Sequence, residues 1–287
     1  METTTTEAKY ECLLFDMDDT LYPLTSGLNL ACRKNIQDYM LHHLNIEENQ
    51  VPKLCLDLYK EHGTTMAGLK ALGYQFDDDE FHAFVHGRLP YETLKPDPVL
   101  RSILLSVPQR KIIFTNADKV HAAKVVSRLG LEDCFDGFIC FETLNPTPNQ
   151  NVPAEKINTM TNDDLNSDSY ANGLSSNCVD GDDKYNSNTV GRILCKPSLE
   201  AFEMAFGIAN IDPKRTIFFD DSPRNIATGK EAGLHTILVG SSVLVPGADL
   251  ALESIHNIRE ALPEIWQDGE QMEPVLAATS AEAIVLA

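Results

Sequence analysis

Short apolar runs that end in polar residues recur along the chain, and longer stretches with helical spacing separate them. The runs cover Cys12–Phe15, Lys111–Phe114, Phe138–Phe141, Thr216–Phe219 and His235–Val239. Runs of this length are typical of buried strands. Their alternation with helical stretches predicts an α/β fold, in which helices cover both faces of a mostly parallel sheet.

The helical stretches of this core carry recognisable ends. After the second run, Asp118 is a candidate helix cap, and Gly130 closes an apolar stripe formed by Val120, Ala123, Val126 and Leu129. Acidic caps and closing glycines are the usual signals of helix ends. Two further helices are expected over 198–206 and from Ser222 to about Gly233.

The strand pattern disappears between Tyr22 and about Leu105. Apolar residues there recur at helical spacing, for example at Ile36, Tyr39, Met40 and Leu44. We therefore expect a helical module at 22–105, inserted between the first and second strands of a core made of 9–21 and 106–262. Periodicity alone leaves open whether this module is a separate domain or one more helical layer.

Two segments have a different composition. Residues 145–190 are rich in Asn, Asp, Ser and Gly, and residues 263–287 are acidic and then rich in Ala. The first segment has too few apolar residues to offset the entropy of ordering it. We expect a disordered surface insertion at 145–190, which interrupts the core, and a loose tail at 263–287.

Two carboxylates, Asp16 and Asp18, directly follow the first apolar run. Ligands of open α/β sheets bind at the carboxyl ends of the strands. A carboxylate there can attack phosphorus, its neighbour can transfer protons, and the pair attracts a hard cation such as Mg²⁺. Taken alone, the pattern also occurs by chance, or as a metal clamp in enzymes that act on nucleotide sugars.

Further polar side chains follow the later runs in order. Thr115 and Asn116 are suited to holding a phosphate oxygen, Lys196 precedes a predicted helix, and Asp220 and Asp221 end the fourth run. Each of them alone is more simply explained as a turn residue, a surface lysine or a helix cap. The coincidence of all of them at strand ends favours a site.

This ordered set resembles the four motifs of the haloacid dehalogenase superfamily. The resemblance implies a Rossmann-like, doubly wound parallel sheet and a helical cap of the C1 type at 22–105. It also implies that Asp16 is the nucleophile and Asp18 the acid and base. Thr115, Asn116 and Lys196 would bind phosphate, and Mg²⁺ would be held by Asp16, Asp18, Asp220 and Asp221, with Asp221 the preferred direct ligand. Asp220 would ligate directly, act through water or pair with Lys196.

Asp18 separates two branches of this superfamily. The dehalogenase members need neither Mg²⁺ nor an acid two residues after the nucleophile, whereas the phosphatase members need both. The flanking segments Asp16–Tyr22, Tyr59–Leu69 and Leu94–Asp97 are similar to those of fungal and plant pyrimidine 5′-nucleotidases. The similarity implies hydrolysis of UMP or CMP, with Tyr59, His62 and Thr65 as candidate contacts to the nucleoside.

The net charge and the cysteine content restrict the class of binding partner and the cellular compartment that we expect. The chain has 287 residues and a formal net charge of −20, which argues against a nucleic-acid polymer as partner. Seven cysteines form no zinc-like spacing, and no uncharged apolar stretch reaches membrane-spanning length. We expect a small phosphorylated metabolite as partner, no membrane, a monomer or small homo-oligomer, and a cytoplasmic location, with the nucleus as an alternative.

Two other functions stay open. One is a phosphatase or phosphomutase that acts on a sugar phosphate or another small phosphorylated metabolite. The other is a non-catalytic protein that senses Mg²⁺ or phosphate, because receiver domains also combine acids, Thr and Lys. Receiver domains are shorter and lack a helical insertion after the first strand, which favours the enzyme.

Overall fold

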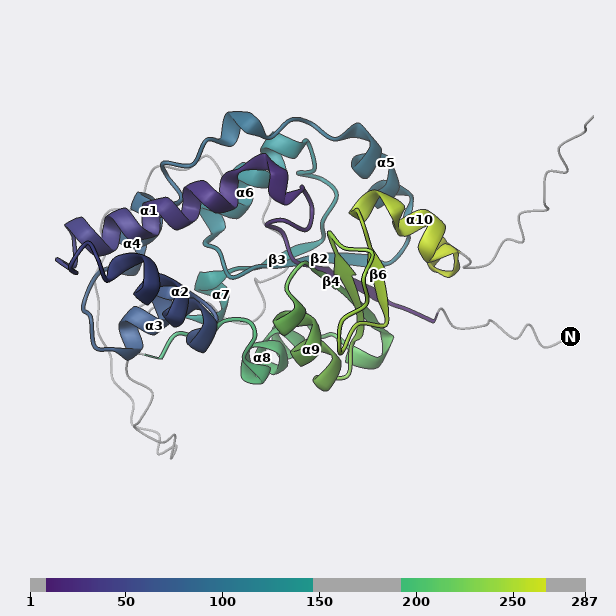
Figure 1. The fold of residues 1–287 in the computed structure, drawn as a ribbon. Coiled ribbons are helices and arrows are strands. Elements are labelled where there is room, and N and C mark those ends of the chain that lie inside the picture. Colours follow the sequence, from purple (N-terminus) through teal and green to yellow (C-terminus); the bar gives the residue numbers. More distant parts are fainter. Residues whose placement is uncertain (1–8, 147–191, 267–287) are drawn as a thin grey trace, which may run out of the picture.

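A parallel sheet forms the centre of the molecule. The computed structural model describes residues 9–146 and 192–266 (Figure 1). Every strand pairs in parallel, in the order β3-β2-β1-β4-β5-β6. The strands are β1 (Cys12–Phe15), β2 (Arg110–Phe114), β3 (Gly137–Ile139), β4 (Thr216–Asp220), β5 (His235–Val239) and β6 (Leu250–Leu252). The predicted α/β fold with a doubly wound parallel sheet is confirmed.

Helices cover both faces of this sheet, because successive residues of β1 point to opposite faces. Leu13 and Phe15 pack with α5, α6 and α10, whereas Cys12 and Leu14 pack with α8 and α9. Figure 1 shows these two groups of helices on opposite sides of the sheet. Their bounds are α5 (Pro98–Ser106), α6 (Lys119–Leu129), α8 (Leu199–Ala209), α9 (Pro223–Glu231) and α10 (Ile258–Ala261).

Four helices between β1 and β2 form a module with a hydrophobic core of its own. They are α1 (Leu28–His42), α2 (Val51–His62), α3 (Thr65–Ala71) and α4 (Asp78–Val85). Tyr39, Leu58 and Phe81 are among the buried residues of this core. We call α1 to α4 the cap. The helix α5 instead packs on the sheet, so the core layer begins before the predicted boundary at residue 106.

The remaining elements are short. The four-residue helix α7 (Phe141–Leu144) follows β3, and 3₁₀ helices occur at Leu24–Ser26, Tyr91–Thr93, Pro213–Arg215, Ile255–Asn257 and Pro263–Trp266. In the described part of the chain, no helix has the length and apolar character needed to cross a membrane.

The end of α2 is one place where the cap contacts the core. Arg224 donates hydrogen bonds to the carbonyls of Tyr59 and Lys60, at 3.2 and 2.8 Å. Gly63 follows α2 with a φ of +88°, and a Cβ atom at this position would lie 2.4 Å from the carbonyl oxygen of Lys196. Only glycine therefore fits between the cap and the chain that carries Lys196.

Both predicted loose segments lie largely outside the described residues. Asn145 and Leu194 flank the predicted insertion and bind each other twice. The Asn145 side chain donates to the Leu194 carbonyl at 3.0 Å and accepts from the Leu194 amide at 2.8 Å. At the other end, Ile265 is buried, so the packed chain continues past the predicted boundary at Leu262.

Candidate active site

The sheet order places the candidate residues around the end of β1. β1 lies between β2 and β4, and chain connections leave it toward both sides of the sheet. Asp16 follows β1, Thr115 follows β2, and Asp220 is the last residue of β4. Such a switch point is where open α/β sheets form their binding crevice. Residues about 200 positions apart in sequence therefore meet there.

A buried ammonium group lies between two of the carboxylates. Lys196 Nζ donates to Asp16 Oδ1 at 2.7 Å and to Asp220 Oδ2 at 2.8 Å, and the lysine is 1% exposed. Burial lowers the pKa of Lys196, but the two carboxylates outweigh burial, and the pKa lies above its usual value. The lysine is thus a fixed positive charge at the nucleophile candidate.

Asp220 and Asp221 have different environments. Asp220 is fully buried and also accepts hydrogen bonds from the Ser222 amide and the Asn225 side chain. Asp220 therefore pairs with Lys196, one of the three roles expected for it. Asp221 is partly exposed, and burial together with the charges of Asp16 and Asp220 raises its pKa.

The three carboxylates fit a hard divalent cation. One oxygen atom each of Asp16, Asp220 and Asp221 lies within 4.8 Å of the others. Burial and the neighbouring acids also raise the pKa of Asp16, which shows that the cluster repels further negative charge. An all-oxygen donor set suits Mg²⁺ rather than zinc. Asp16 and Asp221 lie close enough to bind one such ion, and its positive charge would balance their negative charges.

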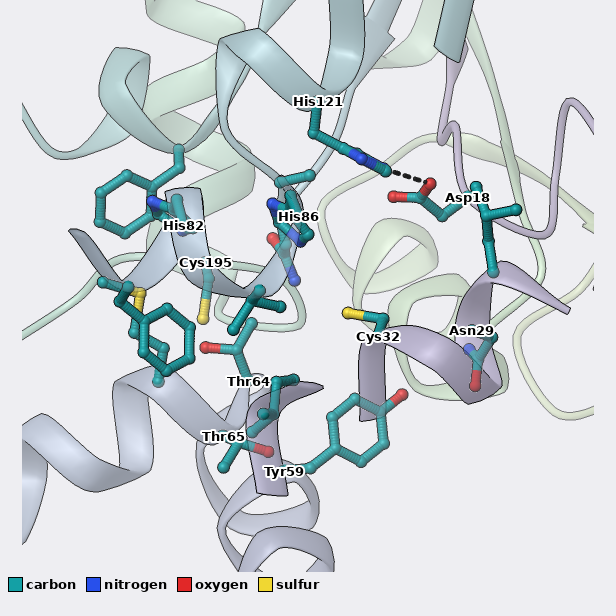
Figure 2. Close-up of a pocket in the computed structure, with 18 of the residues that line it drawn as sticks. Asp18, Asn29, Cys32, Tyr59, Thr64, Thr65, His82, His86, His121 and Cys195 are labelled. Carbon is teal, nitrogen blue, oxygen red and sulfur yellow. Dashed lines mark hydrogen bonds and ion pairs between the residues drawn. The ribbon is translucent and has the colours of Figure 1, made fainter. Parts of the chain in front are cut away.

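Asp18 is held at one of its two oxygens. Its Oδ1 accepts a hydrogen bond from the Tyr22 hydroxyl. The same atom accepts a hydrogen bond from Nε2 of His121 at 2.8 Å, as Figure 2 shows. Burial raises the pKa of Asp18, but His121 and Tyr22 together lower it below its usual value. Burial lowers the pKa of His121, and the Asp18 charge raises it. The two side chains therefore form an ion pair.

Thr115 and Asn116 have different contacts. Thr115 is 1% exposed, and its hydroxyl accepts a hydrogen bond from the Ala117 amide. The Asn116 side chain binds the main chain of Lys196 in both directions, at 2.8 and 2.9 Å. These two hydrogen bonds hold the main chain of Lys196, and the expected role of the Asn116 amide in phosphate binding stays a prediction.

A cavity of about 240 Å³ lies between this site and the cap. Asp18 and His121 line it from the core, and Tyr59 and Thr65 line it from the cap. The Thr65 hydroxyl also donates to the Cys55 carbonyl at 3.0 Å, which ties it into the cap. His62, the third expected contact, lines a separate cavity beside Lys70 and Arg192.

Several residues of the site were not expected from the sequence. They are Tyr22, His121 and Asn225, which bind Asp18 or Asp220. The helical stripe was placed through Val120, which is 54% exposed, whereas Ala122 and Val125 are buried. The buried stripe of α6 runs through residues 122, 125 and 129, and Asp118 is the N-cap. His121 lies beside this stripe in the first turn. A stripe drawn through these positions would have predicted from the sequence that His121 is buried.

Comparisons with known proteins give a partial relative and a set of similar folds. No protein-family model matches the chain. Phosphate metabolism protein 8 from Saccharomyces cerevisiae is 31% identical over 132 residues, which cover 43% of this chain and 41% of the yeast protein. The match thus spans less than half of that relative.

Solved structures with a similar chain path include enzymes of more than one kind. A HAD phosphatase from Thermococcus onnurineus is 14% identical, with a TM-score of 0.48, over 88% of this chain and 97% of that one. L-2-haloacid dehalogenase from Xanthobacter autotrophicus is 13% identical, with a TM-score of 0.47, over 88% and 98%. β-Phosphoglucomutase from Clostridium difficile is 17% identical, with a TM-score of 0.47, over 90% and 97%.

The parallel sheet and the helical module after β1 agree with the fold that the resemblance to the haloacid dehalogenase superfamily implies. Lys196 binds both Asp16 and Asp220, and Thr115 follows the neighbouring strand β2. Fold and site thus define an α/β protein that carries a lysine and several carboxylates at the switch point of its parallel sheet.

Proposed function

We propose that this protein is a Mg²⁺-dependent phosphomonoester hydrolase in which Asp16 forms an aspartyl-phosphate. One observation carries the proposal: Asp16 and Asp18 stand at the same strand end, one bound to a buried lysine and the other facing the cavity. Dehalogenase chemistry needs no acid at the second position. An acid there supports phosphoryl transfer, in which a leaving oxygen must be protonated.

The first step uses the fixed charge of Lys196. An Asp16 oxygen attacks phosphorus in line, forming the aspartyl–phosphorus bond while the bond to the leaving oxygen breaks. Lys196 balances the charge that would otherwise repel the phosphate dianion from the acidic cluster. Thr115, which is buried beside this strand end, is the candidate donor to a non-bridging phosphate oxygen.

Asp18 transfers the proton in both steps. The charge of a bound phosphate raises the proton affinity of Asp18 against the effect of His121, so that the carboxyl group can protonate the leaving oxygen. In the second step, the resulting carboxylate takes a proton from water, which attacks phosphorus and releases inorganic phosphate from Asp16. Asp16 is then regenerated as a carboxylate, and the cycle balances.

A cation held by Asp16 and Asp221, with the main-chain carbonyl of Asp18 as a further candidate ligand, would neutralise the charge of the transferring phosphoryl group. Asp220 takes no direct part in this assignment, because its oxygens are engaged by Lys196, Ser222 and Asn225.

For the substrate, we propose a pyrimidine nucleoside 5′-monophosphate. The similarity of Tyr59–Leu69 to the pyrimidine 5′-nucleotidases supports this assignment. Tyr59 is 44% exposed at the cavity, and the Arg224 guanidinium lies over its ring at 4.5 Å. An aromatic ring fixed in this way offers a stacking face for a base. Tyr59→Ala should raise KM for UMP more than it lowers kcat.

The test is phosphate release from UMP, CMP, AMP, sugar phosphates and 4-nitrophenyl phosphate, with and without Mg²⁺. Hydrolysis of UMP and CMP ahead of AMP supports the full proposal. Equal rates on UMP, AMP and a sugar phosphate would remove the nucleotidase assignment and keep the hydrolase. No release from any substrate, with Mg²⁺ binding retained, would favour the sensing protein.

A phosphomutase is the second candidate, because that reaction uses the same nucleophile and acid. A mutase needs a bisphosphate to restart turnover, whereas a hydrolase does not. Turnover of a sugar phosphate that starts only after a sugar bisphosphate is added would therefore replace the hydrolase assignment.

A further inference from the structure

Two donors from different parts of the fold converge on one oxygen of Asp18. Tyr22 belongs to the loop after β1, and His121 belongs to the first turn of α6. A carboxylate can only accept hydrogen bonds, so Nε2 of His121 must carry the proton in this contact. Among the described residues, no hydrogen bond reaches Oδ2, and the Asp18 side chain is 37% exposed at the cavity.

The His121 ring is itself fixed on several sides. Its Nδ1 atom lies 2.7 Å from the Tyr91 hydroxyl, and the ring is 2% exposed. It stacks on His86 with 4.4 Å between the ring centroids. His86 binds Asp118, the residue that caps α6. The helix cap, the two stacked rings and Tyr91 thus hold the His121 donor in one place.

We infer that His121 is a positioning residue for the acid–base step. It holds Asp18 by Oδ1, so that Oδ2 is the atom that faces the leaving oxygen and carries the catalytic proton. This inference rests on the proposed hydrolase function and adds a residue that the four motifs do not include. Without His121, Tyr22 alone would hold Oδ1, and a carboxyl group held by one donor would spend more of its time turned away from the substrate. Orientation of this kind contributes to rate.

The effect of losing the His121 donor on the rate of hydrolysis should depend on the leaving group. An alkoxide leaves poorly and needs the proton of Asp18, whereas 4-nitrophenolate is stable enough to leave without it. Loss of the His121 donor should therefore slow the hydrolysis of an alkyl phosphate and spare that of 4-nitrophenyl phosphate. The ratio of kcat/KM for the two substrates measures this effect, because kcat/KM reports the step that breaks the leaving bond and not the later hydrolysis.

Two variants of His121 separate the donor from the ring. His121→Phe keeps a ring that can stack on His86 but has no donor. His121→Gln places an amide donor near the former Nε2 position. For the alkyl phosphate with the highest turnover in the substrate panel, His121→Phe should lower kcat/KM by about 10- to 100-fold, less than the roughly 100- to 10,000-fold contribution of a general acid, because Asp18 itself remains. With 4-nitrophenyl phosphate the loss should stay below about threefold, and His121→Gln should recover most of the alkyl activity.

His256→Gln is the matched control. His256 also donates from Nε2 to a carboxylate, Asp97 Oδ2, at 2.7 Å, but it lines neither cavity. The His256→Gln variant should leave the ratio of kcat/KM for the two substrates unchanged, whether or not its melting temperature changes. Equal losses on both substrates in His121→Phe would mean a structural role, and no loss on either would mean no role. Each result overturns the inference while the hydrolase stands. A wild-type protein that hydrolyses no monoester would overturn both.

Discussion

At the scale of single residues, the site is a balance of buried charges. Lys196 supplies one positive charge to a cluster of three carboxylates, Asp16, Asp220 and Asp221, and burial together with the neighbouring acids raises the pKa of Asp16 and of Asp221. A carboxylate cluster in deficit of positive charge binds cations and protons readily. A neutral substitution of Asp16 is therefore informative, because Lys196 keeps Asp220 as its ion-pair partner.

Replacing Asp16 by Asn tests the nucleophile. An amide keeps the shape and can still accept from Lys196 Nζ, but it cannot attack phosphorus. Turnover should fall at least about a thousandfold. The melting temperature should hold or rise, because one of the repelling carboxylates is gone. Phosphate release and a thermal melt check the two parts. Near-native turnover in this variant would exclude the aspartyl-phosphate mechanism.

His82 links stability to acidity. Burial lowers its pKa from 6.5 to about 4, so between these values the unfolded chain binds a proton that the folded chain does not. Stability from this group is present above pH 6.5 and is lost as the pH falls toward 4. The loss amounts to at most about 3 kcal/mol.

His82→Phe should make the pH dependence of unfolding shallower over that window, because the variant has no group to titrate there. Urea unfolding between pH 4 and 7 measures the slope. His86 also has a pKa lowered by burial, so part of the slope should remain. An unchanged slope would show that the pKa of His82 is the same in the folded and the unfolded chain.

At the scale of elements, the end of α2 touches the chain that carries Lys196. Gly63 and Gly73 both have φ near +90°, but only Gly63 has neighbours where a Cβ atom would stand. The two glycines therefore separate backbone strain from contact with the core.

Gly73→Ala should cost about 1 kcal/mol of stability and leave kcat unchanged. Gly63→Ala adds a clash with the Lys196 carbonyl, so it should cost at least about 2 kcal/mol and lower kcat about tenfold or more, because Lys196 must move. Chemical unfolding and steady-state kinetics on both variants provide the comparison. Equal effects at the two positions would mean that the contact with Lys196 is unimportant.

Most core elements could be predicted because their residues are uniformly apolar and their ends carry recognisable caps. β1 and β5 have the predicted bounds, and Asp118 and Gly130 end α6 as expected. The predicted bounds of an element were wrong where its local sequence pattern and its tertiary packing favour different structures. The apolar run Phe138–Phe141 ends as a strand at Ile139, because Cys140 caps the helix α7. β6 has only three residues, too few for a visible alternation.

The candidate site divides in the same way. Residues at strand ends, such as Asp16 and Asp220, were predictable because the strand itself marks them. His121 and Tyr22 were not, because their roles depend on the meeting of α6 with the loop after β1. The segment of α5 was included in the predicted module because no strand pattern occurs before about Leu105. The absence of a strand does not say against which surface a helix packs.

At the scale of the whole molecule, cation binding should couple activity to stability. Excess chelator should remove activity, Mg²⁺ should restore it, and Ca²⁺ should inhibit because its looser coordination misplaces the phosphate. Mg²⁺ should also raise the melting temperature, since an ion that binds only the folded state stabilises it.

Asp221→Asn should raise the Mg²⁺ concentration needed for half-maximal activity at least about tenfold and weaken the thermal shift, because one ligand loses its charge. Titrations of activity and of melting temperature with Mg²⁺ measure both effects. Full activity of the wild type in excess chelator would contradict the metal assignment.

The paired amide groups of Asn145 and Leu194 have a consequence for how this protein can change length. The described chain before residue 147 and after residue 191 meets at Asn145 and Leu194, which two hydrogen bonds join. Lys196 follows directly after that point, and Asn116 fixes it independently. We therefore expect that polypeptide can be gained or lost between 147 and 191 without altering the distance from Lys196 to Asp16. Another folded module could then be grafted next to the candidate active site.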